Sequence, residues 1–332
     1  MPVAQAFDKL GEPLKLPCGV VLRNRIAKSA MSDSLGDGRG NPTATQIRLY
    51  ERWDDGGVAI SIIGELQGNS AAAEKPGNLV LTADADTTMF ETLARRGGGG
   101  EPRLWVQLGH AGAMAYPPIS APKGPSAVNI PGLQCAALSA NEIRQLPGEF
   151  ARTASLARRL GFGGVQIHAA HGFLLSQFLS PLFNQRTDCY GGSIENRMRL
   201  LLEVIEAVRE SVGPEYPVAV KLNSSDQLEG GLQEHEALAV VAALDRTSLD
   251  LLDISGGTYF PGAKAASDSA GGGPYFLDFA KHARTLTSKP IMLTGGFKTR
   301  QQAVDALGAG IDVIGLARAL VLDPELPGKW LA

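Results

Sequence analysis

The feature of this sequence that most constrains its fold is a regular alternation of short apolar runs with segments of helical periodicity. Eight apolar runs have the length of a strand, and each precedes a segment whose apolar residues recur at helical spacing. No change of composition marks a linker between any two of these units. Eight strand-helix units in 332 residues predict one α/β domain over residues 1–332, a single (β/α)8 TIM barrel.

The elements of this barrel can be located along the chain. Residues 14–26 indicate a short N-terminal β-hairpin ahead of the first barrel strand. We expect strands at 26–31, 58–64, 103–109, 164–168, 217–223, 249–255, 289–295 and 311–317, and helices at 43–55, 87–96, 140–160, 193–212, 232–246, 274–287 and 299–310. A doubly wound sheet would need a dinucleotide fingerprint after its first strand. The glycine-rich segment GDGRGN lies among loop residues, and no helix opens on it.

Charge and cysteine content limit the partners and the compartment. A net charge of -3 provides no basic field, so we expect neither nucleic acid nor anionic lipid as a partner. The three cysteines, Cys18, Cys135 and Cys189, show no paired spacing, which favours a reducing compartment over a disulfide framework. The first residues do not read as an export signal, and no apolar run approaches ~20 residues. We therefore expect a cytoplasmic protein.

The densest chemistry lies at residues 163–197, around the pair His168 and His171. An apolar run ends at His168, and a spacing of three brings both imidazoles to one face if the loop turns helically. There they can bind one ligand together. Two alternatives remain open at this point: two unrelated histidines bonded to backbone carbonyls, or a zinc site. Zinc lacks support, because no further His or Cys nearby completes a tetrahedral set, and we expect no metal.

Polar residues also end the other apolar runs, where the active site of a barrel forms. These strand tips are Ser29 to Ser32, Gly64 with Glu65, Gln107 with His110, Lys221 with Asn223, Ser255 to Thr258, Gly295 with Gly296, and Ala317 with Arg318. Together they predict one ring of functional groups. Taken singly, Glu65, Asn223 and Asp226 are expected to be solvated loop residues.

Two neighbouring tips indicate a phosphate site. Gly295 and Gly296 leave backbone N–H groups free to point at an anion, and Arg318 after the eighth strand can bind it bidentately. Phosphates in this architecture bind at the seventh and eighth strands. The alternative is that the glycines form only a tight turn and that Arg318 is a surface residue.

Several motifs, in one order and spacing, carry a family resemblance. They are LWVQLGHAG, HAAHGF, FLSPLFNQRTDCYGGSIENR, VKLNSSD and GLARALVLDPELP, and they extend over nearly the whole chain. In these motifs the chain resembles the old yellow enzymes, FMN-dependent (β/α)8 ene-reductases of the NADH:flavin oxidoreductase group. The resemblance implies tightly bound FMN and NADPH or NADH as co-substrate. It also implies reduction of the C=C bond of an enone or nitro-alkene by ping-pong hydride transfer, and it permits a homodimer.

The resemblance also assigns residues to the cofactor. Ser29, Ala30, Met31 and Ser32 look like the segment beside the flavin. Gly64 and Gln107 match positions at the pyrimidine side of the ring, and Lys221 matches a cation that stabilises the reduced flavin. Gly295, Gly296, Ala317 and Arg318 match the FMN phosphate site.

The same resemblance assigns His168 and His171 to the substrate. The pair matches two donors to the carbonyl or nitro oxygen, where negative charge develops, and Phe173 stands in the substrate pocket. Relatives usually have a Tyr at that position that protonates the α-carbon, and a phenyl ring cannot donate a proton. Tyr259, Tyr116 or water are the candidate donors. A second departure lies at residues 110–114, where many relatives carry a basic residue after the glycine.

Other functions compete with this interpretation. Dienoyl reductases and amine dehydrogenases of the group use an iron–sulfur centre on a cysteine cluster and an added domain, and we expect neither in this sequence. A flavin-free aldolase or isomerase would explain the barrel and the phosphate tips, but not Gln107 and the histidines. A flavin-binding protein with weak or lost turnover remains open because of Phe173.

Overall fold

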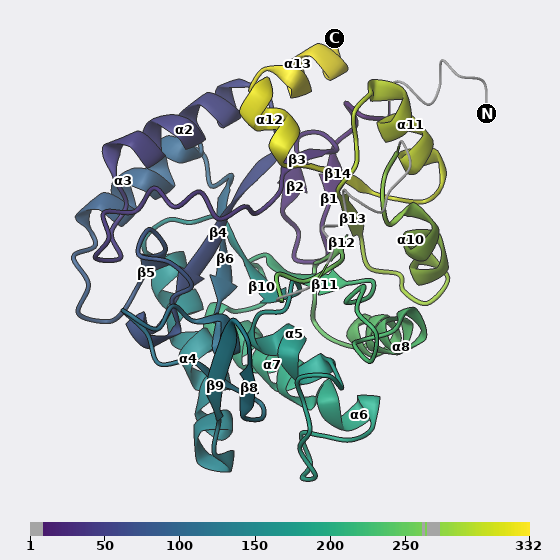
Figure 1. Ribbon diagram of the computed structural model, residues 1–332. Helices are drawn as coiled ribbons and strands as arrows, with labels where there is room; N and C mark the ends of the chain where they lie inside the picture. The colour runs from purple at the N-terminus through teal and green to yellow at the C-terminus, as the bar shows by residue number, and fades with distance from the viewer. Residues whose placement is uncertain (1–8, 261–262, 264–272) are drawn as a thin grey trace.

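The computed structural model describes residues 9–260, 263 and 273–332, and it contains the expected barrel. Its eight parallel strands are β3 (Ile26–Lys28), β4 (Ile60–Gln67), β6 (Leu104–Gly109), β10 (Gly164–Ala169), β11 (Val218–Asn223), β12 (Leu251–Ser255), β13 (Ile291–Thr294) and β14 (Val313–Leu316). The ring closes because β3 pairs with both β14 and β4. Figure 1 shows the helices arranged around this ring.

The helices that cover the barrel follow the sequence prediction closely, with additions. They are α2 (Ala44–Asp55), α3 (Thr88–Gly97), α4 (Ala140–Arg159), α5 (Leu174–Leu179), α6 (Ile194–Arg197), α7 (Arg199–Val212), α8 (Glu234–Asp245), α10 (Leu277–Arg284), α11 (Arg300–Gly308), α12 (Arg318–Leu322) and α13 (Leu326–Leu331). The helix expected at 193–212 is broken at Met198, which caps both α6 and α7. The short helices α5, α12 and α13 were not predicted.

Two strands end three residues away from their expected ends. The first, β3, ends at Lys28 and not at residue 31, although Ser32 still forms a single bridge with Gly64. The second, β4, continues to Gln67, and its register with β6 shifts between Ile63 and Leu66. This irregularity has the form of a β-bulge, which redirects the side chains that it contains.

The N-terminal hairpin closes one end of the barrel. It consists of β1 (Leu14–Lys15) and β2 (Val21–Leu22), which pair antiparallel as expected. Leu16 and Leu22 are buried against Ala27, Leu251 and other apolar side chains from the first half of the barrel strands. The hairpin therefore plugs the N-terminal end of the barrel with apolar groups, and a second cluster fills the layer between strands and helices.

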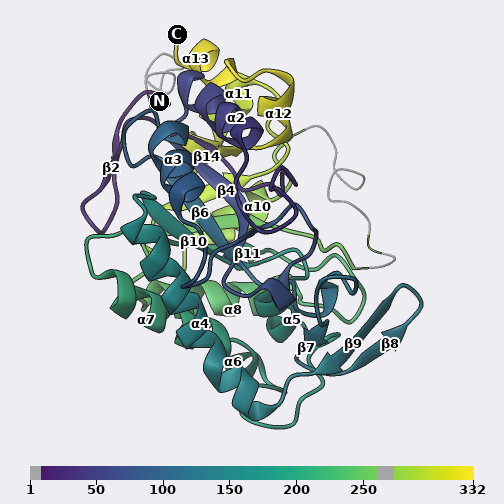
Figure 2. The same cartoon turned by 90° about the vertical axis from the view of Figure 1, so that its left-hand side faces the viewer.

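A small sheet between β6 and α4 was missed by the sequence analysis. It consists of β7 (Lys123–Gly124), β8 (Val128–Ile130) and β9 (Leu133–Ala137), in the order β7-β9-β8. Figure 2 shows that it extends away from the barrel on the side of α5. Its strands have two to five residues, too few for a periodic pattern to stand out. A further short strand, β5 (Leu79–Val80), pairs with the end of β4.

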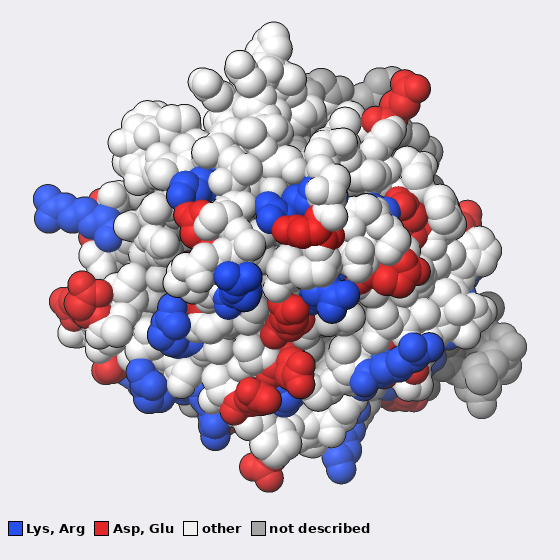
Figure 3. Space-filling view, turned by 90° about the horizontal axis from the view of Figure 1, so that it is seen from below, with Lys and Arg blue, Asp and Glu red and all other residues white. Residues whose placement is uncertain are grey.

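The surface carries charges of both signs. Lys and Arg alternate with Asp and Glu over the face shown in Figure 3, without a region of one sign. Within the described part of the chain, no helix has the length and apolar character needed to span a bilayer. The three cysteines are free thiols: Cys18 is half-buried, Cys135 is buried and Cys189 is exposed.

Candidate active site

A layer of polar side chains crosses the inside of the barrel above the apolar plug. Asp253 accepts hydrogen bonds from Gln166 Nε2 at 2.9 Å and from Thr294 Oγ1 at 2.6 Å. Gln107 Nε2 donates to Gln166 Oε1 at 2.8 Å, and Ser29 Oγ lies 2.8 Å from Thr294 Oγ1. Four of these side chains come from β6, β10, β12 and β13, and Ser29 directly follows β3, so the layer fixes the strand ends relative to each other.

Lys221 adds a fixed positive charge to this polar layer. Its Nζ lies 3.3 Å from Asp253 Oδ2, and the two side chains are 1% and 0% exposed. Burying such a pair is costly unless hydrogen bonds satisfy the carboxylate, and Gln166 and Thr294 do so here. The sequence analysis predicted Lys221, Gln107 and Ser29 in the site.

The carboxylate that holds Lys221 was missed. Asp253 and its neighbour in the network, Gln166, lie in buried strands two residues before Ser255 and His168, respectively. Because side chains alternate along a strand, residues two apart point to the same face. Polar residues at alternate positions of an apolar run were therefore the signal that could have found both.

His168 and His171 meet at the tip of β10. Nε2 of His168 lies 3.2 Å from Nδ1 of His171, and their ring planes are inclined at 74°. His171 has a left-handed backbone, φ 62°, and its N–H donates to Asn223 Oδ1 at 3.1 Å. Its Nε2 lies 2.9 Å from Ser255 Oγ. The structure thus brings the predicted pair together, although by a left-handed turn at His171 and not by a helix.

Both imidazoles are held in the neutral form. Burial lowers the pKa of His168 well below its usual value, and His171 and Lys221 add to this effect. Burial, with help from Lys221, lowers the pKa of His171 to about 3. At neutral pH each ring therefore carries one N–H and one acceptor nitrogen. Among the described residues, no group of three His, Cys, Asp or Glu side chains is arranged to bind a metal.

The expectation that Glu65, Asn223 and Asp226 are solvated is wrong. They are 3%, 0% and 1% exposed, respectively. Glu65 lies in the bulge of β4 with φ 55°, which turns its side chain into the barrel, where Oε1 is 3.8 Å from Nδ1 of His168. Asn223 Nδ2 donates to Asp226 Oδ1 and to the Gly257 carbonyl, so both residues brace the loop that holds His171.

Phe173 lies beside the histidines, as the sequence predicted. It is 2% exposed, its ring centroid is 4.8 Å from that of His168, and it packs with Ala111 and Ala115. The Tyr259 ring lies 6.1 Å from that of Phe173 and 5.9 Å from that of His171. Tyr259 is 67% exposed, so its hydroxyl can exchange protons with water.

Tyr116 and His110 belong to the loop after β6. Tyr116 is 42% exposed and its backbone N–H donates to the Ala73 carbonyl at 3.0 Å. Nδ1 of His110 accepts a hydrogen bond from the backbone of Gly112 at 3.0 Å, and burial lowers the pKa of His110 to about 4. His110 therefore serves the turn of its own loop as a neutral acceptor.

The expected phosphate residues lie at adjacent strand tips. Thr294 of β13 pairs with Gly315 of β14, which sets Gly295 and Gly296 beside Ala317 and Arg318. The two glycines have φ of 116° and 85°, and a Cβ on Gly296 would lie 2.1 Å from the Gly273 carbonyl oxygen. Arg318 is exposed and begins α12. Backbone N–H groups in this left-handed turn and an exposed guanidinium fit a phosphate.

The first strand tip has a buried and an accessible part. Ser29 is fully buried, whereas Ala30, Met31 and Ser32 are partly exposed. Gly64 lets the backbone of Met31 approach, since a Cβ there would lie 2.5 Å from the Met31 carbonyl carbon. The tip, Gln107 and Lys221 thus surround the mouth of the barrel with donors and one cation, a set that fits a planar, electron-accepting ring such as a flavin.

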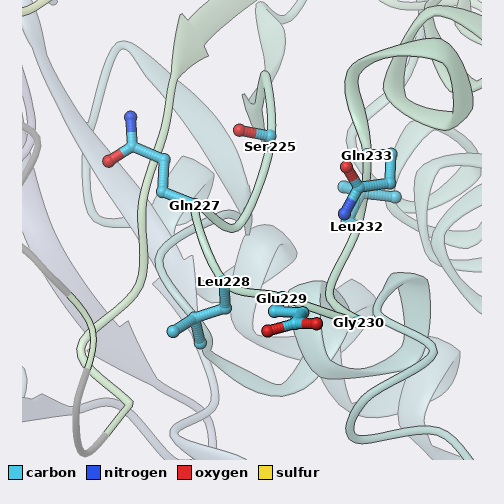
Figure 4. A pocket seen from close by; sticks show the side chains of 7 residues that line it. All are labelled: Ser225, Gln227, Leu228, Glu229, Gly230, Leu232 and Gln233. Carbon is cyan, nitrogen blue, oxygen red and sulfur yellow. The ribbon is translucent and has the colours of Figure 1, made fainter.

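A hollow of about 370 Å³ opens next to this mouth. Figure 4 shows its lining, the loop Ser225, Gln227, Leu228, Glu229, Gly230 with Leu232 and Gln233 at the start of α8. The loop continues from Asn223, and the Ser225 carbonyl accepts the N–H of Gly257. The hollow therefore borders the loops that carry His171 and Ser255.

Comparison with known proteins identifies related chains. The sequence profile of the NADH:flavin oxidoreductase / NADH oxidase family matches residues 9–330. The NADH-dependent flavin oxidoreductase iliE of Hypocrea jecorina is 34% identical, over 95% of this chain and 87% of that protein. The NADH oxidase of Thermoanaerobacter brockii is 30% identical, over 93% of this chain but 49% of that protein. The chain thus spans about half the length of some relatives.

Solved structures show the same fold. An old yellow enzyme homologue from Zymomonas mobilis superposes with a TM-score of 0.81 at 25% identity, covering 97% of this chain and 92% of that one. A 2-naphthoyl-CoA reductase in complex with 2-naphthoyl-CoA superposes with a TM-score of 0.90 at 26% identity. It covers 97% of this chain and 52% of that one.

Proposed function

The chain belongs to the NADH:flavin oxidoreductase / NADH oxidase family, which includes the old yellow enzymes, and from this premise we propose that it is an FMN-dependent ene-reductase. In this proposal it reduces the C=C bond of α,β-unsaturated carbonyl or nitro compounds with NADH or NADPH. Family membership removes the flavin-free aldolase or isomerase from the alternatives. We also propose that the substrate is a small molecule, that the protein is cytoplasmic and that it can form a homodimer.

Residues at the barrel mouth would hold the cofactor. Ser29 to Ser32, Gly64, Gln107 and Lys221 would contact the ring, and Gly295, Gly296, Ala317 and Arg318 would bind the phosphate. When bound, FMN supplies hydride transfer between the nicotinamide and the alkene. Lys221, fixed by Asp253 at 3.3 Å, would stabilise negative charge on the bound ring.

The observation that carries the proposal is the convergence of the two imidazoles. Nε2 of His168 and Nδ1 of His171 are 3.2 Å apart at the mouth of the barrel, so both can approach one oxygen atom. A carbonyl or nitro oxygen becomes negative as hydride arrives at the β-carbon. Two N–H donors aimed at it lower the barrier, by about 3 kcal/mol for each donor in comparable sites.

Phe173 makes a second function worth testing. It fills the position from which relatives usually donate the proton, and its ring has no donor. A flavin-binding protein with weak or lost turnover would keep all the cofactor residues and lose this one. Tyr259, whose ring lies 5.9 Å from that of His171, is the donor that the geometry favours for an active enzyme.

Rapid-mixing kinetics separate the two functions. The purified holoprotein is reduced anaerobically with NADH or NADPH, and flavin absorbance is followed. It is then mixed with 2-cyclohexenone or a nitro-alkene. Reoxidation by the alkene, with formation of the saturated product, supports the ene-reductase. Bound FMN that is reduced but not reoxidised by any alkene supports the second function, and a protein that binds no FMN contradicts both.

A further inference from the structure

While both rings are neutral, the two histidines can donate to one oxygen only if their outer nitrogens carry no proton. Each ring is neutral and carries one N–H, so an N–H on the inner nitrogen leaves the outer nitrogen as an acceptor. The outer nitrogens are Nδ1 of His168 and Nε2 of His171. The groups that face them therefore decide whether the pair functions as a double donor.

The outer nitrogen of His171 faces a hydroxyl. Nε2 lies 2.9 Å from Oγ of Ser255, which is 6% exposed and can donate its proton or accept one. The outer nitrogen of His168 is different. Its Nδ1 is buried without a hydrogen-bond partner among the described residues, and the acid group facing it is Glu65, with Oε1 at 3.8 Å. A buried nitrogen of this kind is expected to have a partner.

Glu65 is placed for that role by the backbone. The bulge in β4 holds it at φ 55°, which is uncommon for a residue other than glycine, and turns it toward His168. Gln67 Nε2 donates to its other oxygen, Oε2, at 3.1 Å, so Oε1 is the oxygen left for a proton. A movement of about 1 Å would bring Oε1 within hydrogen-bond distance of Nδ1.

Burial favours the protonated acid. Removal from water raises the pKa of Glu65 well above its usual value, and the charge of Glu74 raises it further. Lys75 and Lys221 oppose this, and the neutral His168 adds no charge. A protonated carboxyl is an O–H donor, whereas a carboxylate would draw the His168 proton to Nδ1 and leave Nε2 without one.

We propose that Glu65, as a neutral carboxylic acid, donates its O–H to Nδ1 of His168 and so holds the N–H of that ring on Nε2, facing the substrate oxygen. When a ligand oxygen is bound, Ser255 does the same for His171 from the other side. Glu65 and Ser255 are then positioning residues for the oxyanion site. The role in catalysis depends on the proposed function, but the position of the proton on His168 does not.

The arrangement also predicts a change on ligand binding. Without a ligand, Nε2 of His168 donates to Nδ1 of His171 at 3.2 Å, so the proton of His171 lies on Nε2 and is donated to Ser255. When a ligand oxygen enters between the rings, both inner nitrogens must donate. The proton of His171 then moves to Nδ1 and the Ser255 hydroxyl reverses.

The test is to observe the imidazole protons directly. The sequence has five histidines, so ¹H–¹⁵N correlation spectra of ¹⁵N-histidine-labelled protein can be assigned by single substitutions. Spectra of the FMN-bound protein at pH 7 should show His168 with its proton on Nε2. Addition of 2-cyclohexenone, which does not titrate, should move the proton of His171 from Nε2 to Nδ1.

Matched variants identify Glu65 as the cause. Glu65→Gln keeps an N–H donor of the same length, so His168 should retain its Nε2 proton and the cyclohexenone Kd should change less than about twofold. Glu65→Met keeps the length without a donor, and the Kd should rise about tenfold, as expected for one lost hydrogen bond. If His168 loses its Nε2 proton as the pH rises, Glu74→Gln should move this loss to lower pH, because the negative charge that raises the pKa of Glu65 is gone.

Two results would overturn the proposal. One is a wild-type His168 with its proton on Nδ1 at pH 7, a measurement that requires no variant. The other is a folded Glu65→Gln protein that loses the Nε2 proton as Glu65→Met does. If the tautomers are as proposed and no alkene is reduced, the proposed function fails while the role of Glu65 stands.

Discussion

At the residue scale, Gly164 and Trp105 fit closely against each other in the barrel interior. The two residues are directly paired across β10 and β6, and a Cβ on Gly164 would lie 2.6 Å from the Trp105 ring. We expect Gly164→Ala to lower the free energy of unfolding by about 1–3 kcal/mol, because the indole must shift in a filled core. Urea unfolding followed by tryptophan fluorescence measures this.

Gly308→Ala is the matched control for that substitution. Gly308 ends α11, and a Cβ there would meet nothing within 4 Å. The same chemical change should therefore leave stability unchanged or raise it by up to about 1 kcal/mol. Equal losses in the two variants would show that the Trp105 contact is not the cause.

Phe173→Tyr should restore a proton donor beside His168. The ring is buried and 4.8 Å from that of His168, so a para-hydroxyl would enter the pocket between the histidines and Tyr259. We expect reoxidation by an enone to become at least about tenfold faster, since a positioned acid contributes ~10²–10⁴-fold, while reduction by NADH is unchanged. Stopped-flow absorbance of the two half-reactions tests this.

Tyr259→Phe is the companion measurement. If Tyr259 supplies the proton in the wild type, its removal should slow the enone step alone. Suppose that Phe173→Tyr leaves the rate of flavin reoxidation by the enone unchanged and that Tyr259→Phe lowers it. The wild type then obtains its proton through Tyr259 and needs no donor at position 173.

Residue-level prediction succeeded where chemistry and strand position agree. His168 ends an apolar run, and the two imidazoles do lie together, although a left-handed turn at His171 joins them and not the helical turn that their spacing suggested. The prediction for Glu65 was wrong because its environment depends on a bulge. A bulge changes the face on which a side chain lies without any change in composition. Asp253 was missed for a related reason: it was taken as part of an apolar strand, and its position on the face that points into the barrel was not considered.

At the scale of elements, β3 and α2 enclose a lysine that the sequence analysis did not single out. Lys28 is buried, and its Nζ donates to Tyr50 OH at 3.1 Å and to the Ile62 carbonyl at 2.8 Å. The same Nζ lies 4.7 Å from the ring centroids of Tyr50 and Trp53. Burial lowers the pKa of Lys28 to about 7; Asp33 opposes the shift and Lys221 adds to it.

This shift gives folding a pH dependence with a definite sign. Between about pH 7 and the usual lysine pKa of 10.5, the unfolded chain holds a proton that the folded chain has lost. Stability therefore rises with pH across this window, and the contribution is constant below it. We expect the wild type to gain stability relative to Lys28→Met between pH 7 and 9.5, measured by urea unfolding. Parallel profiles of the two proteins would contradict this.

Element-level prediction depended on length. The long helices were predictable because their helical periodicity extends over several turns. The eight barrel strands were predictable because each is a run of several apolar residues. The break between α6 and α7 occurs at Met198, a good helix former, so no local signal marks it. The β7-β9-β8 sheet escaped because its strands are shorter than any reliable window.

At the scale of the whole molecule, the two ends of the barrel should respond independently. The hairpin closes the N-terminal end, while the histidines lie at the tip of β10, a six-residue strand about 20 Å long. We expect Leu16→Ala or Leu22→Ala to cost about 2–4 kcal/mol through a cavity, with the FMN dissociation constant unchanged. Chemical unfolding and flavin fluorescence titration measure the two quantities.

A double variant makes the independence quantitative. Leu16→Ala and His171→Ala should change stability additively, within about 0.5 kcal/mol, because distant sites without shared partners do not couple. A larger deviation would show that the polar layer transmits strain from the hairpin to the mouth.

The barrel can close only after its last strand has been synthesised. The first strand needs the last one: β3 pairs with β14, and Arg25 donates to the Asp312 carbonyl across 287 positions of the chain. At ribosomal speeds that interval takes roughly 15–60 s, during which one edge of the first strand stays unpaired on the nascent chain. A translational pause anywhere between these two strands lengthens that exposure, whereas a pause before residue 26 does not.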